Sequence, residues 1–150
     1  MQIKMNVAVP VEYFFTQLID SARYDIHAQT GKNVAPRNLL NFTYRKQMAN
    51  GQTARCTITD YAPGAVYAYT LRTGRNDYTV AYKLSTAQDG STQLVYSEEA
   101  VGATKTVDAN NRATGILMGW FRKRRFKQMA RAIEQSYIGT GERLNVQSRF

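Results

Sequence analysis

Closely spaced turn signals divide residues 42–99 into five short segments. Asn50-Gly51 and Asp89-Gly90 are typical of two-residue hairpin loops, and Pro63-Gly64 and Gly74-Arg75-Asn76 also mark turns. Sequential hairpins form an antiparallel meander, and the sequence lacks the strand–helix–strand alternation of a parallel nucleotide-binding sheet. The expected strands are residues 42–48, 53–61, 66–73, 78–84 and 92–99.

Periodic patterns before the meander predict one more strand and a helix. Residues 2–9 alternate between apolar and polar side chains, which is typical of a half-buried strand. After Pro10, apolar side chains recur at spacings of three and four up to Ile26. This pattern predicts a helix that ends at Thr30-Gly31, with a break near Asp20-Ser21 left open.

After the meander we expect a polar loop at residues 101–111 and a long helix at residues 112–137. Residues 138–150 contain two glycines and no periodicity, so this tail is expected to be poorly ordered. The prediction is therefore one α+β domain at residues 1–137, followed by the tail.

The C-terminal helix carries apolar side chains on two opposite sides. With residues about 100° apart, one stripe consists of Met118, Phe126, Met129, Ala130, Ile133 and Tyr137, and it is expected to lie on the sheet. Ile116, Leu117, Trp120 and Phe121 fall mostly on the other side. Either the helix breaks near Gly119, or the aromatic end meets a second subunit, a membrane surface or a ligand.

Part of the net charge of +9 lies in one basic cluster, which consists of Arg122, Lys123, Arg124, Arg125, Lys127 and Arg131. Such a cluster is most often a solvated helix face. A peripheral contact with an anionic membrane is one alternative, through a patch of Trp120, Phe121, Arg122, Arg124 and Lys127. A homodimer through Ile116–Lys127 is another, whereas nucleic acid is not expected because no aromatic platform on strands is interleaved with the cluster.

The sequence favours a cytoplasmic protein without metal or cofactor. Cys56 is the single cysteine and cannot form an internal disulfide, and the longest apolar run is well short of the roughly 18 residues of a membrane span. The only histidine, His27, suits the end of the first helix, and Cys56 alternates with Ala54 and Ile58 as a small core residue would. We find no zinc-ligand spacing or phosphate-binding loop, and we name no catalytic residue.

Tyrosines on neighbouring strands indicate a candidate ligand cavity. Aromatic rings with polar tips line pockets for partly apolar ligands, although aromatic residues also favour strands for packing alone. Alternation does not determine which sheet face is concave, and Glu98 and Arg72 are the ionisable strand residues expected to enter. The candidate cavity residues are Tyr67, Tyr69, Tyr82, Tyr96, Glu98, Met118, Trp120 and Met129.

The element order and several short segments carry a family resemblance. The segments are Phe14-Phe15, Leu18-Ile19-Asp20-Ser21, Tyr24-Asp25-Ile26, Gln29-Thr30-Gly31-Lys32, Asn50-Gly51, Tyr67 with Tyr69, Arg75-Asn76, Tyr82 and Lys123-Arg124-Arg125-Phe126. Over residues 1–137 the chain resembles a small uncharacterised bacterial family of the START-like (SRPBCC, polyketide-cyclase-like) superfamily. The resemblance implies a helix-grip fold, with a curved antiparallel sheet wrapped on a long C-terminal helix and a cavity between them for apolar molecules.

That superfamily contains binders and enzymes alike, so the fold alone implies no reaction. Our first expectation is a non-enzymatic binder of a small hydrophobic or aromatic molecule, held between the tyrosines and Met118, Trp120 and Met129. One alternative is an interaction module that acts through Ile116–Lys127. The other is a cyclase- or hydrolase-type enzyme that uses Glu98 or Arg72.

Overall fold

The computed structural model describes residues 1–49, 51–102 and 123–139 of the chain. Within these ranges no helix has the length and hydropathy needed to cross a bilayer. The elements are β1 (Gln2–Val7), α1 (Val11–Thr30), the short 3-10 helix η1 (Pro36–Asn38), β2 (Thr43–Gln47), β3 (Thr53–Ala62), β4 (Val66–Arg72), β5 (Asn76–Thr86), β6 (Thr92–Gly102) and a C-terminal helix at residues 123–139.

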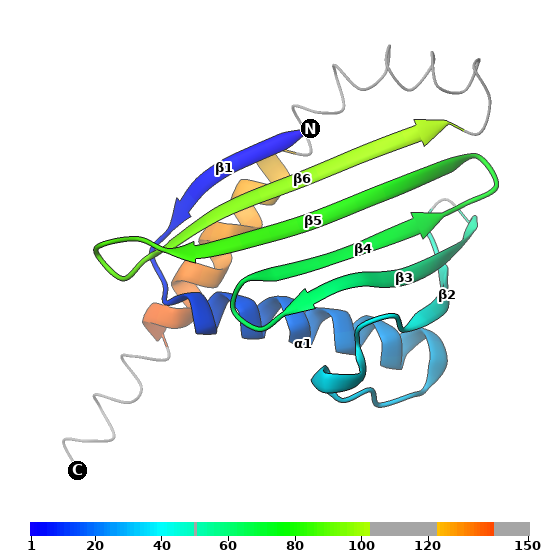
Figure 1. Cartoon of the computed structure of the whole chain (residues 1–150), viewed down its shortest axis with the longest axis horizontal. Helices are drawn as coiled ribbons and strands as arrows, with labels where there is room; N and C mark the ends of the chain where they lie inside the picture. The colour runs from blue at the N-terminus through cyan, green and yellow to red at the C-terminus, as the bar shows by residue number, and fades with distance from the viewer. Residues whose placement is uncertain (50, 103–122, 140–150) are drawn as a thin grey trace.

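The strands form one curved six-stranded sheet in the order β1-β6-β5-β4-β3-β2. Every neighbouring pair is antiparallel, so β2 to β6 form the meander that the turn signals predicted, and β1 adds to its far edge. Figure 1 shows α1 and the C-terminal helix on the same side of the sheet. We call the sheet face beneath these helices the inner face and the opposite one the outer face.

Helix α1 is continuous from Val11 to Thr30, so the break that the sequence left open near Asp20-Ser21 does not occur. Both of those side chains are exposed, and the buried stripe of the helix continues past them to Ile26. The helix ends at Gly31, whose φ of 75° lets its N–H donate to the His27 carbonyl as a left-handed cap.

The sequence placed several strand ends wrongly. Strands β5 and β6 extend to the pair Asn76↔Gly102, whereas the predicted strands began at residue 78 and ended at residue 99, and β5 ends at Thr86 rather than at residue 84. Asp77, the charged residue of this extension, is exposed on the outer face and therefore does not end the strand. Strand β1 stops at Val7 rather than at residue 9, because the Val9 N–H turns back to the Val7 carbonyl at 2.8 Å.

The C-terminal helix lies on the sheet through the stripe that its sequence predicted. Phe126 and Ala130 are buried, and Met129 and Ile133 pack against the same core. Phe126 stacks on the ring of Tyr96 with 4.3 Å between ring centroids. The predicted first part of this helix, including Met118, lies outside the described residues.

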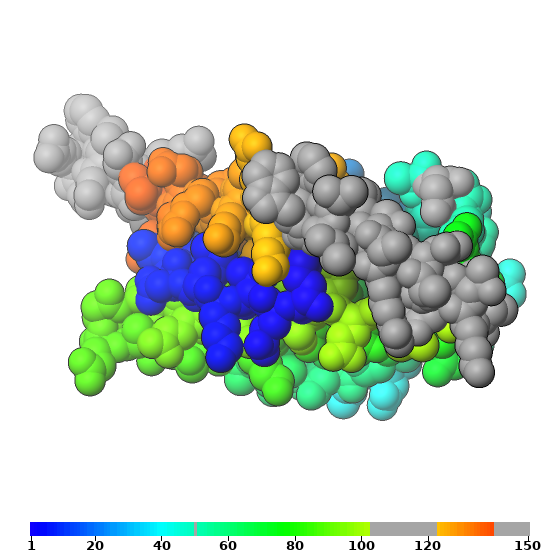
Figure 2. All heavy atoms as spheres, turned by 90° about the horizontal axis from the view of Figure 1, so that it is seen from above, coloured from blue at the N-terminus to red at the C-terminus, as the bar shows by residue number. Residues whose placement is uncertain are grey.

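Glu134 joins the C-terminal helix to the start of the chain. This carboxylate is only 9% exposed, and its Oε1 accepts hydrogen bonds from the Ala8 backbone N–H at 2.9 Å and from Arg131. Two residues further on, the Tyr13 and Ser136 hydroxyls are 2.7 Å apart. Figure 2 shows the orange C-terminal helix packed directly against the blue N-terminal segment.

We expect Glu134→Ala to lower the free energy of unfolding by about 1–3 kcal/mol, because the Ala8 N–H loses its acceptor. Glu134→Gln keeps an acceptor oxygen and should lose less. Urea denaturation measures both changes, and Glu99→Ala on the exposed outer face is the control. Equal losses for Glu134→Ala and Glu99→Ala would contradict this role.

Candidate functional site

The inner face carries a row of four tyrosines, one from each of β3 to β6. Tyr61 pairs in register with Tyr67, Tyr67 with Tyr82, and Tyr82 with Tyr96. The ring centroids of Tyr67 and Tyr82 are 6.0 Å apart, and those of Tyr82 and Tyr96 are 5.0 Å apart. The tyrosines that the sequence placed on neighbouring strands therefore share one surface beneath the helices.

A β-bulge in β3 brings Tyr61 into this row. The register shifts between Ile58 and Asp60, so one extra residue separates the inward positions of Ile58 and Tyr61. Without the bulge, strict alternation would direct Tyr61 to the outer face.

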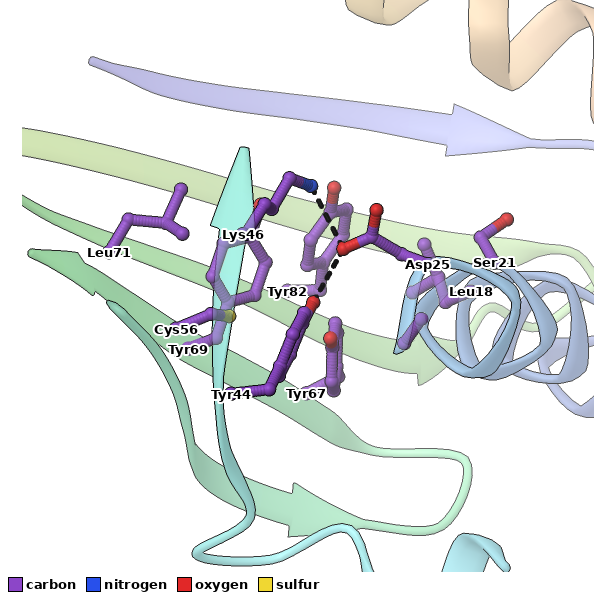
Figure 3. A pocket seen from close by; sticks show the side chains of 11 residues that line it. Leu18, Ser21, Asp25, Tyr44, Lys46, Cys56, Tyr67, Tyr69, Leu71 and Tyr82 are labelled. Atoms are coloured by element: carbon purple, nitrogen blue, oxygen red, sulfur yellow. Dashed lines mark hydrogen bonds and ion pairs between the residues drawn. The ribbon is translucent and has the colours of Figure 1, made fainter. Parts of the chain in front are cut away.

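A pocket of about 160 Å³ lies between α1 and the inner face, over the middle of the tyrosine row. Helix α1 provides one wall, and β2 to β5 provide the other (Figure 3). The lining residues are Leu18, Ser21, Ala22, Asp25, Tyr44, Lys46, Cys56, Tyr67, Tyr69, Leu71 and Tyr82.

Asp25 anchors a polar group on the β2 side of the pocket. Its Oδ2 accepts a hydrogen bond from the Tyr44 hydroxyl at 2.6 Å and another from Lys46 Nζ at 3.0 Å, and Figure 3 shows both donors converging on it. Burial and the hydrogen bond to Asp25 raise the pKa of Tyr44 far above its usual value, so its hydroxyl remains a donor. The Lys46 and Asp25 side chains are 30% and 27% exposed, which places this ion pair at the pocket mouth.

Three other tyrosine hydroxyls line the pocket without a partner. Among the described residues, those of Tyr67, Tyr69 and Tyr82 make no hydrogen bond, although Tyr67 is only 6% exposed. Burial raises the pKa of each phenol, and together with the negative charge of Glu98 it raises the pKa of Tyr82 to about 12. All three are therefore neutral donors at pH 7. None of the three hydroxyl oxygens is fully buried, so each can donate a hydrogen bond to an occupant of the pocket that offers an acceptor.

Cys56 contributes a small apolar surface to the pocket. It is buried, and desolvation raises the pKa of its thiol despite the opposing effects of the Tyr44 hydrogen bond and the Lys46 charge. The thiol therefore remains protonated, in agreement with the packing role that its alternation predicted.

The structure separates the predicted cavity residues into three groups. Tyr67, Tyr69 and Tyr82 line the pocket. Tyr96 lies on β6, one strand beyond the pocket, where its hydroxyl donates to Glu98 Oε2 at 3.1 Å and its ring is covered by Phe126. Met129 packs on the core from the C-terminal helix. Met118 and Trp120 lie outside the described residues.

The two ionisable strand candidates have different outcomes. Glu98 is half-buried and shares the strand face of Tyr96 and Leu94, but it does not line the pocket. The expectation that Arg72 enters a pocket is wrong, because Leu71 takes the inward position and leaves Arg72 exposed on the outer face.

The interaction patch is described only in part. Arg124 and Lys127 are exposed on the C-terminal helix, whereas Trp120, Phe121 and Arg122 lie outside the described residues. The patch, the homodimer and the membrane contact therefore remain predictions.

The sequence analysis missed the α1 wall of the pocket and Lys46. Leu18, Ala22 and Asp25 recur at i, i+4 and i+7, which places them on one face of a helix. Lys46 follows Tyr44 by two residues and therefore shares its strand face. These spacings were available in the sequence, but only the apolar members of the helix were counted as inward-facing.

A second hollow, of about 540 Å³, lies beside the start of α1 and is lined by Val11, Phe15, Ile19, Tyr61 and Pro63 among others. Its charged members, Glu12 and Asp20, are exposed. No three His, Cys, Asp or Glu side chains of the described ranges are grouped as metal ligands would be.

The family described as a domain of unknown function, DUF3284, matches residues 1–119. The chain belongs to this family. The matched segment includes every residue that lines the pocket. No curated protein matches the sequence.

Several solved structures share the fold. MLL2253 from Mesorhizobium loti is 17% identical with a TM-score of 0.54, and the match covers 90% of this chain and 93% of that one. A conserved protein from Geobacillus kaustophilus is 15% identical with a TM-score of 0.55, over 90% and 95% of the two chains. DynU16, from the dynemicin biosynthetic locus, is 14% identical with a TM-score of 0.53; the match covers 94% of this chain but only 47% of DynU16. The architecture is therefore the α+β helix-grip (START-like) fold that the resemblance implied.

The raised phenol pKa values predict a loss of stability in alkali. A folded-state pKa above the unfolded value stabilises the fold below the unfolded pKa, and this contribution is lost as the pH rises through the folded pKa. For Tyr82 this pH window runs from the ordinary phenol pKa of 10.0 to the raised pKa of about 12. Urea denaturation across this range should give a flatter decline for Tyr82→Phe than for the wild type. Tyr24→Phe, at a position 78% exposed, should decline as the wild type does, and identical slopes for all three proteins would refute the assignment.

Proposed function

We propose that this protein binds a small, mostly apolar molecule, with one aromatic ring and at least one hydrogen-bond acceptor, in the pocket between α1 and the sheet. The observation that carries the proposal is the set of three tyrosine hydroxyls that line an apolar space without partners among the described residues. Leu18, Ala22 and Leu71 supply the apolar contacts around them.

The volume of the pocket limits the size of the ligand. An engineered cavity of about 150 Å³ in another protein takes up benzene. The 160 Å³ measured here is close to that volume and well below the roughly 300–1,000 Å³ of pockets for drug-sized ligands. A single substituted ring is therefore the favoured occupant, ahead of a lipid or a multi-ring polyketide.

The polar groups of the pocket support binding over catalysis. Oδ2 of Asp25 already accepts hydrogen bonds from Tyr44 and Lys46, and the phenols and the Cys56 thiol are held in their neutral forms. A general base needs a free acceptor within reach of the substrate and a pKa near the working pH. These groups are better arranged to orient a ligand than to transfer its protons.

Binding can be tested with small single-ring probes. Ligand-detected NMR titrations with phenol, indole and acetophenone measure affinity, and native mass spectrometry of the purified protein detects a ligand that copurifies. We expect Tyr69→Phe to weaken acetophenone binding by about 2- to 13-fold, the equivalent of one hydrogen bond, without lowering the free energy of unfolding.

A variant that fills the pocket provides a second test of ligand binding. Ala22→Leu places a larger side chain in the pocket wall and should abolish probe binding, while Tyr24→Phe on the exposed side of α1 should bind as the wild type does. Urea denaturation of each variant establishes that it is folded. The proposal fails if no probe binds and nothing copurifies, or if Ala22→Leu binds as tightly as the wild type.

A further inference from the structure

Three arginines form a row across the outer face of the sheet. Arg45 of β2 pairs in register with Arg55 of β3, and Arg55 pairs with Arg72 of β4. All three side chains are exposed. Because neighbouring strands are about 4.8 Å apart, the row brings three positive charges onto a short line.

This arrangement costs stability in the absence of a bound anion. Like charges at directly facing positions of a sheet are destabilising. Asp77 follows Arg72 in register on β5, but no described carboxylate forms an ion pair with any of the three arginines. Asp77 therefore opposes only the end of the row at Arg72, and the Arg45–Arg55 pair faces no carboxylate in register among the described residues.

A row of threonines lies beside the arginines on the same face. Thr43, Thr57 and Thr70 are paired in register across β2, β3 and β4, and the hydroxyls of Thr43 and Thr57 are 3.0 Å apart. A hollow of about 340 Å³ is lined by Thr43, Tyr44, Arg45 and Arg55. Arg45, Arg55 and Thr43 thus border one depression, and Arg72 lies next to Arg55 in the row.

From this surface we infer a second binding site, specific for a phosphate group, around Arg45, Arg55 and Arg72. Guanidinium groups bind phosphate oxygens through paired hydrogen bonds, and hydroxyls complete the coordination of such a group. A phosphate offers more charge and more acceptor oxygens than one carboxylate and therefore matches a row of three cations better. The site lies on the opposite face from the tyrosine-lined pocket and does not depend on the function proposed for it.

Inorganic pyrophosphate is the first probe, titrated calorimetrically at low ionic strength because salt screens exposed charges. Arg55→Gln removes the middle member of the row and should weaken binding by about tenfold or more, as the loss of hydrogen bonds to a charged group does. Arg75→Gln makes the same change of charge in the exposed turn between β4 and β5 and should stay within about twofold of the wild type.

The second measurement is the thermal stability of the protein without any ligand. Because Arg55 lies between two like charges, Arg55→Gln should raise the Tm of the unliganded protein by about 1–3 °C at low salt, and Arg75→Gln should not. Equal pyrophosphate affinities and equal Tm values for the two variants would overturn the inference.

Further titrations distinguish the sources of the phosphate. Phosphatidylcholine vesicles that contain a phosphoinositide should bind in an Arg55-dependent way if the group belongs to a lipid headgroup, whereas binding of pyrophosphate alone indicates a soluble phosphate compound. Either result supports the site. Arg55-dependent binding of a single-stranded oligonucleotide without pyrophosphate binding would overturn it in favour of a nucleic-acid backbone.

Discussion

The antiparallel register of the inner sheet face is the constraint on which the rest of the structure depends. It places Tyr61, Tyr67, Tyr82 and Tyr96 in one row, and each end of the row is covered by a different helix. The ring centroids of Phe15 in α1 and Tyr61 are 5.7 Å apart. Those of Phe126 in the C-terminal helix and Tyr96 are 4.3 Å apart. The pocket lies over the middle of the row, where Tyr67 and Tyr82 face α1. A register slip of one residue in any strand would turn its tyrosines outward and remove both the helix contacts and the pocket wall.

The parts of the fold that local chemistry determines were predictable. Asn50-Gly51 and Asp89-Gly90 predicted their hairpins, and the spacing of Phe126, Ala130 and Ile133 predicted the buried side of the C-terminal helix. Features that depend on contacts between residues distant in the sequence were not predictable. The bulge in β3 that turns Tyr61 inward leaves no periodic signature, and Asp25 on α1 becomes part of a site only because β2 brings Tyr44 and Lys46 to it. Likewise, Glu134 follows Phe126 and Ala130 at spacings of four, but a carboxylate on a buried stripe is not predictable without its partner, which is the backbone of Ala8.

The two faces of the sheet have opposite electrostatic character, although the same strands supply both. Alternation along β2 directs Tyr44 and Lys46 inward and Arg45 outward, and along β3 it directs Cys56 inward and Arg55 outward. The inner face presents neutral phenols beside the Asp25–Lys46 ion pair, whose opposite charges offset each other, and this combination suits an uncharged ligand. The outer face presents guanidinium groups to water, which solvates their positive charge, and this charge attracts anions. Occupants of the two faces would therefore differ in charge.

The unpartnered hydroxyls of the pocket connect stability with binding. A phenylalanine at Tyr67, Tyr69 or Tyr82 would keep the ring packing, so packing alone gives no reason for the hydroxyl at these positions. Each hydroxyl is accessible from the pocket, and once a ligand accepts its hydrogen bond the binding free energy adds to the stability of the folded state. Binding sites are commonly places where a protein tolerates lower stability than its fold could reach. The tyrosine row therefore has the energetic character of a recognition surface rather than of a core optimised for stability.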